Sequence, residues 1–402
     1  MSRDIFSCDF LIAGAGIVGL SVARELKKRY PNAKIIILEK EIRTGMHASG
    51  RNSGVMHCGI YYGSDTLKAK VCSSGAARMI EFAQAEKIPV HQSGKVILAT
   101  SHEQLPTVEK LLRNAKENNI EARQINNQEL HEIEPYAADV TTAIYCPNTA
   151  VIDSGAVLKR LQEQLEANGV KFFFNCKVTG TKNKEQMETT GGIFHYGFFY
   201  NCAGAYADSL AKMFGLAQQY TLIPFKGIYW KLNAEANPRV RANIYPMPDV
   251  SLPFLGVHLT RVINGDVYVG PTAIPVFGRE NYTKLKGINL AESTEILWKL
   301  AEMYLRNDNN FRTLAHTEMA KYSKKHFLTT ARKLMPSLKA EELIPTTKAG
   351  IRPQLINTKT RTLEMDYIFE KTDHSLHVLN SISPAFTSSF AFAELVVDKA
   401  SL

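Results

Sequence analysis

Several features that would place the chain in a special class are missing from its sequence. No apolar run reaches the roughly 20 residues that a membrane-spanning helix needs. The first ten residues are too few and too polar, ahead of the first apolar run, to form a signal peptide. None of the six cysteines lies in a C-x-x-C pair or at a zinc-ligand spacing from histidine. We therefore expect a cytoplasmic protein with reduced thiols and no bound metal.

The sequence also lacks internal repeats and dense basic runs with interleaved aromatic residues, although its net charge is +9. Binding to nucleic acid is therefore not expected. An excess of basic charge is also typical of proteins that take acidic substrates or lie on an anionic membrane.

Residues 9–39 contain the clearest motif that is present. An apolar run leads into the glycines of a G-x-G-x-x-G turn, Gly14, Gly16 and Gly19, and a second apolar run ends at Glu39. This order of strand, turn, helix, strand and acid is the fingerprint of an adenine-dinucleotide site. The helix N-terminus would face the pyrophosphate, and Glu39 would accept the ribose hydroxyls.

The rest of the chain alternates between patterns typical of helices and of strands. A second turn of small residues, with Ala203 and Gly204, follows an apolar strand and suggests close packing against the same cofactor. Helices are predicted at 65–87 with Asp65 as N-cap, 101–118, 154–168, 289–306 and 315–335, and from near Thr387 to the end. Strands are predicted at 95–100, 171–174, 198–201, 221–232, 254–259, 267–270, 363–369 and 376–379.

The loop at 47–63, HASGRNSGVMHCGIYYG, is rich in glycine, small polar residues, histidine and tyrosine. It resembles the flavin-contacting segment of the D-amino-acid-oxidase-like FAD oxidoreductases. More narrowly, it is similar to the N-S-G-V-x-H-x-G-x-Y-Y pattern of L-2-hydroxyglutarate dehydrogenases and oxidases. SDTLKAKVC at 64–72, FKGIY at 225–229, FLGVH within 253–271, GIRP at 350–353 and SPAFTSS at 383–389 also resemble segments of that family. The likeness runs from about residue 9 to the end, with Ala385 where the family usually has glycine.

The resemblance implies an α/β fold in which a Rossmann-like FAD-binding domain is interleaved with an α+β substrate domain built on a mostly antiparallel sheet. We assign residues 1–88, 148–216 and 345–402 to the first domain, and 89–147 and 217–344 to the second. The cofactor is expected to be FAD, bound non-covalently. Together with the glycine turns, the residues expected to contact it are Gly14, Gly16, Gly19, Glu39, Lys40, Ser49, Asn52, Ser53, Gly54, Val55, Val178, Ala203, Gly204, Ser383, Thr387 and Ser388.

The resemblance also indicates which residues act on the substrate. Arg352 matches the arginine that holds the substrate's α-carboxylate in the wider family, and a guanidinium can bind a carboxylate with two parallel hydrogen bonds. Oxidation of a 2-hydroxy acid requires a base for the hydroxyl proton, and a histidine suits that role near neutral pH. His57 and His258 are both candidates.

The partner of a second, distal carboxylate stays open at this point. Tyr62, Lys226 and Tyr245 are further candidates for the substrate pocket, and Arg261 is a fourth cationic or polar side chain near the same strands. The sequence does not choose among them.

Residues 315–335 combine recurring apolar positions with lysines and arginines and carry no acid after Glu318. A basic amphipathic helix can lie on an anionic membrane, although such a helix more often packs on its own domain. Peripheral contact with the inner face of the cell membrane would favour a quinone or the respiratory chain as electron acceptor. Without it, oxygen remains the alternative.

We therefore expect oxidation of a small 2-hydroxy dicarboxylate, L-2-hydroxyglutarate, to 2-oxoglutarate. One alternative is an FAD-dependent amine oxidase of the glycine or sarcosine oxidase type, which needs no strong base once its substrate amine is neutral. A third hypothesis is a basic binding protein that keeps the nucleotide fold without turnover.

Overall fold

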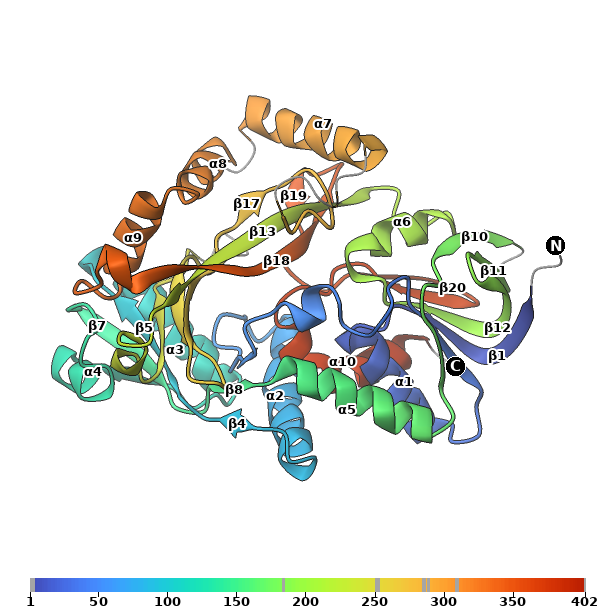
Figure 1. The fold of residues 1–402 in the computed structure, drawn as a ribbon, viewed down its shortest axis with the longest axis horizontal. Helices are drawn as coiled ribbons and strands as arrows, with labels where there is room; N and C mark the ends of the chain where they lie inside the picture. The colour runs from blue at the N-terminus through green and yellow to red at the C-terminus, as the bar shows by residue number, and fades with distance from the viewer. Residues whose placement is uncertain are drawn as a thin grey trace.

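The computed structural model describes residues 4–182, 185–249, 254–283, 287, 290–307 and 311–400. The chain forms two lobes, each built around one large sheet (Figure 1). Within the described residues, no helix is long and apolar enough to cross a membrane.

The first sheet has eight strands in a mixed arrangement. Its centre is parallel, because β1 lies between β2 and β12 and runs in the same direction as both. Leu11 and Ile12 of β1 have no exposed surface, as expected for a strand that is covered on both faces. The strands are β1 (Ile5–Ala13), β2 (Ile35–Leu38), β9 (Lys171–Phe173), β10 (Val178–Lys182), β11 (Gln186–Thr189), β12 (Gly192–Asn201), β20 (Phe369–Thr372) and β21 (Ser375–Val378).

Four helices share one apolar core with this sheet: α1 (Ile17–Arg29), α2 (Leu67–Ala85), α5 (Ser154–Ala167) and α10 (Ala385–Ala400). The last helix crosses α2 at Gly75, where an added Cβ would lie 2.5 Å from the Cα of Ser388. This close approach brings the C-terminal helix beside the N-terminal segments. The short helix α6 (Ala207–Lys212) follows β12.

The second sheet has ten strands in the order β19-β18-β13-β16-β15-β14-β5-β7-β6, with β17 on β13. It is antiparallel except where β14 runs parallel to β5. Its strands are β5 (Lys95–Ala99), β6 (Arg123–Ile125), β7 (Thr142–Cys146), β13 (Tyr220–Leu232), β14 (Asn243–Pro246), β15 (His258–Arg261), β16 (Val267–Gly270), β17 (Ile274–Pro275), β18 (Leu343–Asn357) and β19 (Thr362–Leu363).

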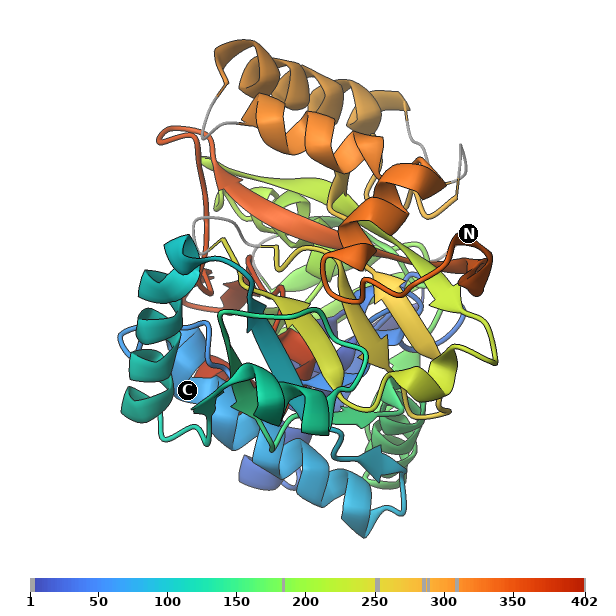
Figure 2. The ribbon, with the colours of Figure 1, turned by 90° about the vertical axis from the view of Figure 1, so that its left-hand side faces the viewer.

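The remaining helices belong to this second lobe, and a small sheet joins the two lobes. Figure 2 shows α7 and α8 on the outside, above the long strands β13 and β18. The helices are α3 (Leu105–Glu117), α4 (Asn127–Ile133), α7 (Leu290–Arg306), α8 (Phe311–Ala320) and α9 (Lys324–Arg332). The small sheet consists of β3 (Val55–Met56), β8 (Ala150–Ile152) and β4 (Val90–His91).

Several sequence predictions need correction. The predicted helix at 315–335 is two helices, α8 and α9, because Ser323 takes an extended backbone conformation and forms the N-cap of the second. The predicted strand at 363–369 is interrupted between β19 and β20, and the one at 254–259 begins only at His258. Helix α2 is capped by Thr66, whose side chain accepts from the Ala69 amide, and not by Asp65.

The position 345, predicted as a domain boundary, lies inside β18, so the chain returns to the first sheet only at β20. The division into two domains otherwise stays a prediction. Asn289 and Pro253, the predicted first residues of a helix and of a family segment, lie outside the described residues.

Candidate active site

The glycine turn after β1 is shaped by close backbone contacts. Gly14 has a φ of +107°, and an added Cβ would lie 2.5 Å from the carbonyl oxygen of Cys202. A Cβ on Gly19 would collide with the carbonyl oxygen of Gly14. Helix α1 begins at Ile17 with no acidic side chain in its first turn, so its N-terminus keeps its partial positive charge. This cradle fits a pyrophosphate.

Glu39 stands at the end of β2 and is held toward the same turn. One of its oxygens accepts from the Ala15 amide at 2.8 Å and the other from the Glu41 amide at 3.0 Å. Ser49 also reaches the turn, because its hydroxyl accepts from the Ile17 amide at 2.9 Å. A buried carboxylate beside the glycine turn matches what an adenosine ribose requires, so this end of the site fits an adenine dinucleotide.

Other predicted cofactor residues lie around this end. Ala203 and Gly204 follow Cys202, whose carbonyl faces Gly14, and Gly204 has a φ of +55°. Val178 packs in the same apolar cluster as Leu38, the residue before Glu39. Gly16 lies beside Ser49, because a Cβ added to Gly16 would be 3.0 Å from the Ser49 hydroxyl oxygen.

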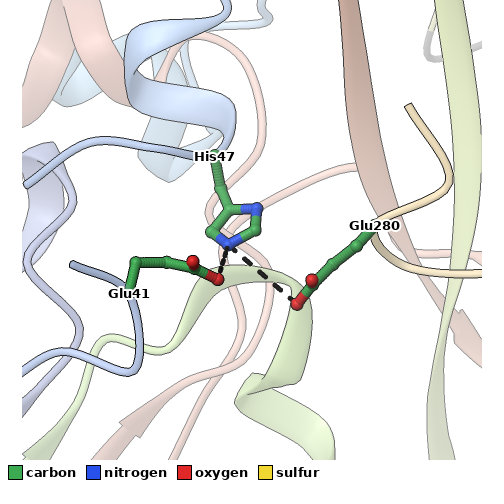
Figure 3. A group of neighbouring side chains, drawn as sticks. All are labelled: Glu41, His47 and Glu280. Carbon is green, nitrogen blue, oxygen red and sulfur yellow. Dashed lines mark hydrogen bonds and ion pairs between the residues drawn. The ribbon is translucent and has the colours of Figure 1, made fainter. Parts of the chain in front are cut away.

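Lys40 belongs to a charged cluster next to the turn. Figure 3 shows Glu41, His47 and Glu280 turned toward one another, with His47 Nε2 2.9 Å from a Glu41 oxygen. The Lys40 ammonium pairs with both carboxylates and lies 2.9 Å from His47 Nε2. The three ligand-type side chains are close enough to hold a metal. Because the lysine pairs with both carboxylates, the cluster forms an ion-pair contact between the loop after β2 and the segment that contains Glu280.

The predicted flavin loop is tied to the start of α10. The Asn52 side chain accepts from the Gly54 amide at 2.8 Å, and Gly54 has a φ of +72°. The His57 amide donates to the Thr387 hydroxyl at 3.3 Å, and that hydroxyl donates to the Val55 carbonyl at 3.2 Å. These bonds bring residues more than 300 positions apart to one side of the site.

The remaining predicted cofactor residues lie in the flavin loop and around the start of α10. Ser388 shares a hydrogen bond with Tyr367 at 2.9 Å, and Ser383 lies exposed in the turn before α10. Ser53 is half-buried in the flavin loop. Tyr62 stands at the α10 end of the site, because the Lys68 ammonium lies 5.7 Å from the centre of its ring and 5.9 Å from that of Tyr367, the partner of Ser388.

The second sheet presents a polar face formed by short neighbouring strands. Because β14 and β15 pair Ile244 with Leu259, their neighbours Tyr245 and His258 project to the same face. The rings of Tyr245 and His258 stack with centroids 4.0 Å apart, and His258 Nδ1 lies 2.9 Å from the Gly256 carbonyl oxygen. A carbonyl can only accept, so Nδ1 carries the proton and the neutral ring leaves Nε2 as an acceptor.

Arg352 lies on β18 opposite Phe225 of β13. Its guanidinium donates to the Thr272 carbonyl at 3.3 Å and lies 5.8 Å from the centre of the Phe254 ring. No carboxylate in the described part of the chain pairs with it. Arg352 therefore remains available to bind a carboxylate from a ligand.

The electrostatics of both histidines favour the neutral form. Burial, together with the charges of Lys95 and Arg352, lowers the pKa of His57 to about 3. Burial also lowers the pKa of His258 to about 3, with Arg352 and Lys95 again contributing. Both rings are therefore neutral at physiological pH and able to accept a proton. An anionic ligand that neutralised the two cations would raise both pKa values and strengthen the bases.

Two predicted substrate residues do not join this face. Lys226 follows Phe225, which is paired with Arg352, so its side chain projects to the opposite side of β13. Arg261 projects away from His258 and Thr260, and its guanidinium donates to the Val240 carbonyl at 2.9 Å. Neither side chain therefore shares the face that carries its strand neighbour, Phe225 in one case and His258 in the other.

Lys95 and Tyr61 were not predicted from the sequence. Lys95 is the first residue of β5 and has no exposed surface, yet its ammonium lies 4.6 Å from the centre of the Tyr61 ring and 5.4 Å from that of Tyr245, which stacks on His258. A lysine directly before the apolar run VILA was the one available signal, because buried lysines are rare without a function or a partner.

Comparisons with known proteins identify the family of the chain. A family model described as "FAD dependent oxidoreductase" matches residues 9–399. The L-2-hydroxyglutarate dehydrogenase of Indibacter alkaliphilus is 36% identical over 398 residues, covering 96% of this chain and 97% of that protein. Its counterpart from Escherichia coli K12 is 34% identical, covering 97% and 92%. The mitochondrial enzyme of that name from Nematostella vectensis is 33% identical, covering 98% and 90%.

Solved structures share the fold at lower identity. An L-alpha-glycerophosphate oxidase from Mycoplasma pneumoniae with FAD bound has a TM-score of 0.77 at 21% identity, covering 98% of this chain and 95% of that one. A glycine oxidase from Geobacillus kaustophilus has a TM-score of 0.73 at 17% identity, with the same coverage.

Proposed function

The chain belongs to the FAD-dependent oxidoreductase family, and from this premise we propose that it oxidises L-2-hydroxyglutarate to 2-oxoglutarate. The observations that carry the proposal are an Arg352 guanidinium with no carboxylate partner among the described residues and two neutral histidines, His258 on the second sheet and His57 on the flavin loop. A carboxylate anchor and a proton acceptor are what oxidation of a 2-hydroxy acid needs. Relatives that carry the name L-2-hydroxyglutarate dehydrogenase, one of them 36% identical over 398 residues, support the choice of substrate.

In the proposed reaction, Arg352 holds the α-carboxylate with charge-assisted hydrogen bonds. FAD, held by the glycine turn and Glu39, would supply the acceptor for the hydride that leaves the substrate's Cα. The hydroxyl proton passes to His57, which lies on the flavin loop and is fixed there by its backbone bond to Thr387. His258, fixed by Gly256 and stacked on Tyr245, lines the pocket as a neutral acceptor that orients the hydroxyl.

Anaerobic reduction of the flavin by a panel of 2-hydroxy and 2-amino acids of both hands tests this function. We expect L-2-hydroxyglutarate to bleach the absorbance near 450 nm, while the D-enantiomer and glycine leave it unchanged. Bleaching by glycine or sarcosine alone would instead identify an amine oxidase. A protein that binds no FAD on reconstitution would overturn both activities.

We further infer that the reduced protein passes its electrons to a membrane quinone. We propose that it docks on the membrane through a surface formed by α7 and the end of α8. Leu297, Trp298 and Leu305 are 53%, 72% and 72% exposed, and Met319 and Tyr322 are also exposed. Exposed apolar groups on a basic protein suit an anionic bilayer surface. The proposed surface therefore includes α7, which the prediction of contact through 315–335 had left out.

Flotation with vesicles tests this docking surface. We expect the wild-type protein to float with anionic but not with zwitterionic vesicles, and Trp298→Ala combined with Leu305→Ala to lower the bound fraction severalfold. Ile42→Ala is the matched control, because Ile42 is 66% exposed in the first lobe. A wild-type protein that stays unbound would remove the docking surface and favour a soluble acceptor such as oxygen.

A further inference from the structure

Lys95 is a buried cation whose hydrogen-bond partner in the described part of the chain is Cys58 Sγ, at 3.7 Å. It has no exposed surface, and no carboxylate among the residues that the structure describes forms an ion pair with it. Its ammonium lies 4.6 Å from the centre of the Tyr61 ring, 5.4 Å from that of Tyr245 and 3.7 Å from Cys58 Sγ. Removing an ammonium from water is costly unless an anion compensates its charge, so the surroundings of Lys95 are suited to bind an anion.

The neighbouring hydroxyl groups also lack partners. The Tyr61 hydroxyl is buried and has no hydrogen bond within the described part of the chain. The Tyr245 hydroxyl approaches that of Thr260, but neither forms a hydrogen bond of normal geometry. Buried hydroxyls without partners are rare in folded proteins, and here they accompany an unpaired cation.

Cys58 is the one neighbouring group that could supply a negative charge. A hydrogen bond with Cys146 lowers the pKa of its thiol, and Lys95 lowers it further. A thiolate would neutralise Lys95, but it would leave the Tyr61 and Tyr245 hydroxyls without partners. A carboxylate has two oxygens and several lone pairs, so it could accept from the ammonium and from the hydroxyls together.

The position of Lys95 relative to Arg352 suggests where this carboxylate belongs. The Lys95 ammonium lies 5.4 Å from the centre of the Tyr245 ring, which stacks on His258 at 4.0 Å, and the charges of Lys95 and Arg352 both lower the pKa of His258. They reach the site from separate strands, β5 and β18, with Tyr245 beside Lys95 and stacked on His258. In the order of strands, His258 on β15 therefore lies between Arg352 on β18 and Lys95 on β5.

We propose that Lys95, with Tyr61 and Tyr245, binds the distal carboxylate of a dicarboxylic substrate whose α-carboxylate is held by Arg352. The inference rests on the proposed function and names its specificity residue. The pocket would select a 2-hydroxy dicarboxylate over a 2-hydroxy monocarboxylate of similar length, because only the former neutralises Lys95.

Lys95→Met tests the proposal, because methionine keeps most of the volume and removes the charge. We expect kcat/KM for L-2-hydroxyglutarate to fall by about 10- to 100-fold, the usual weight of a hydrogen bond to a charged group. The value for L-2-hydroxybutyrate should stay within a few-fold. Glutarate, titrated against the flavin spectrum, should bind more weakly by the same factor, while butyrate should not.

Matched variants separate this role from a structural one. Lys226→Met removes a buried lysine from the opposite side of β13 and should leave the preference for dicarboxylates unchanged. Tyr61→Phe removes one hydroxyl and should weaken glutarate binding about 3- to 10-fold if Lys95→Met does not fold.

Two results would overturn the assignment of Lys95. One is an unchanged preference for dicarboxylates in both Lys95→Met and Tyr61→Phe. The other concerns Lys95→Met alone: the thiolate absorbance of Cys58 near 240 nm disappears while the preference for dicarboxylates stays intact. That result would show that the Cys58 thiolate is the counter-ion of Lys95. If wild-type flavin is reduced by no 2-hydroxy dicarboxylate, the proposed function itself fails.

Discussion

His57→Asn should lower kcat for L-2-hydroxyglutarate by about 10²- to 10⁴-fold, the usual contribution of a positioned general base. Asparagine keeps the size and polarity of the side chain but cannot accept a proton near neutral pH. The backbone bond from residue 57 to Thr387 does not involve the side chain, so the FAD content should stay near one per chain. Stopped-flow reduction of the flavin, rather than steady-state turnover, measures the affected step.

The pH dependence gives a second readout of the same prediction. Because the pKa of His57 is about 3 in the free protein, wild-type kcat/KM should show no acid limb from this group between pH 5 and 8. In His57→Asn, the residual rate should rise with pH as hydroxide replaces the lost base. His258→Asn serves as the comparison and should cost about tenfold. A larger loss in His258→Asn than in His57→Asn would reverse the assignment of the base.

Arg352→Ala should raise KM for L-2-hydroxyglutarate by about 10²- to 10³-fold, corresponding to the 2–5 kcal/mol typical of a truncated charge pair. The α-carboxylate would lose its two charge-assisted hydrogen bonds and its orientation toward the reacting centre. Arg352→Lys should recover part of the loss, because it restores the charge but not the planar fork. Initial rates over a wide range of substrate concentrations measure the effect.

The control for this prediction is Arg261→Ala. That guanidinium binds backbone carbonyl oxygens on the other side of β15, so its loss should lower the melting temperature without a comparable change in KM. A KM for Arg352→Ala close to the wild-type value would contradict a carboxylate-binding role.

The sequence alone determined the adenine-dinucleotide half of the site. Gly14, Gly19 and Glu39 lie within 31 consecutive residues, and the strand–turn–helix–strand unit that contains them is a local structure. The turn geometry follows from which residues tolerate a positive φ and close contact, so short-range chemistry is sufficient. The family resemblance added FAD as the expected cofactor and Arg352, His57 and His258 as candidate site residues. It did not predict how these three side chains are arranged.

Only the tertiary structure decided what surrounds the reacting centre. Which side of a strand a residue occupies depends on the register between strands far apart in sequence, and one step in register exchanges the two faces. That register places Lys226 and Arg261 on the opposite sides of their strands from Phe225 and His258, and it stacks Tyr245 on His258. The same sheet buries Lys95 beside Tyr61, which comes from a different segment of the chain. A buried charge without a partner is a property of the packed fold, and no pattern within one segment reveals it.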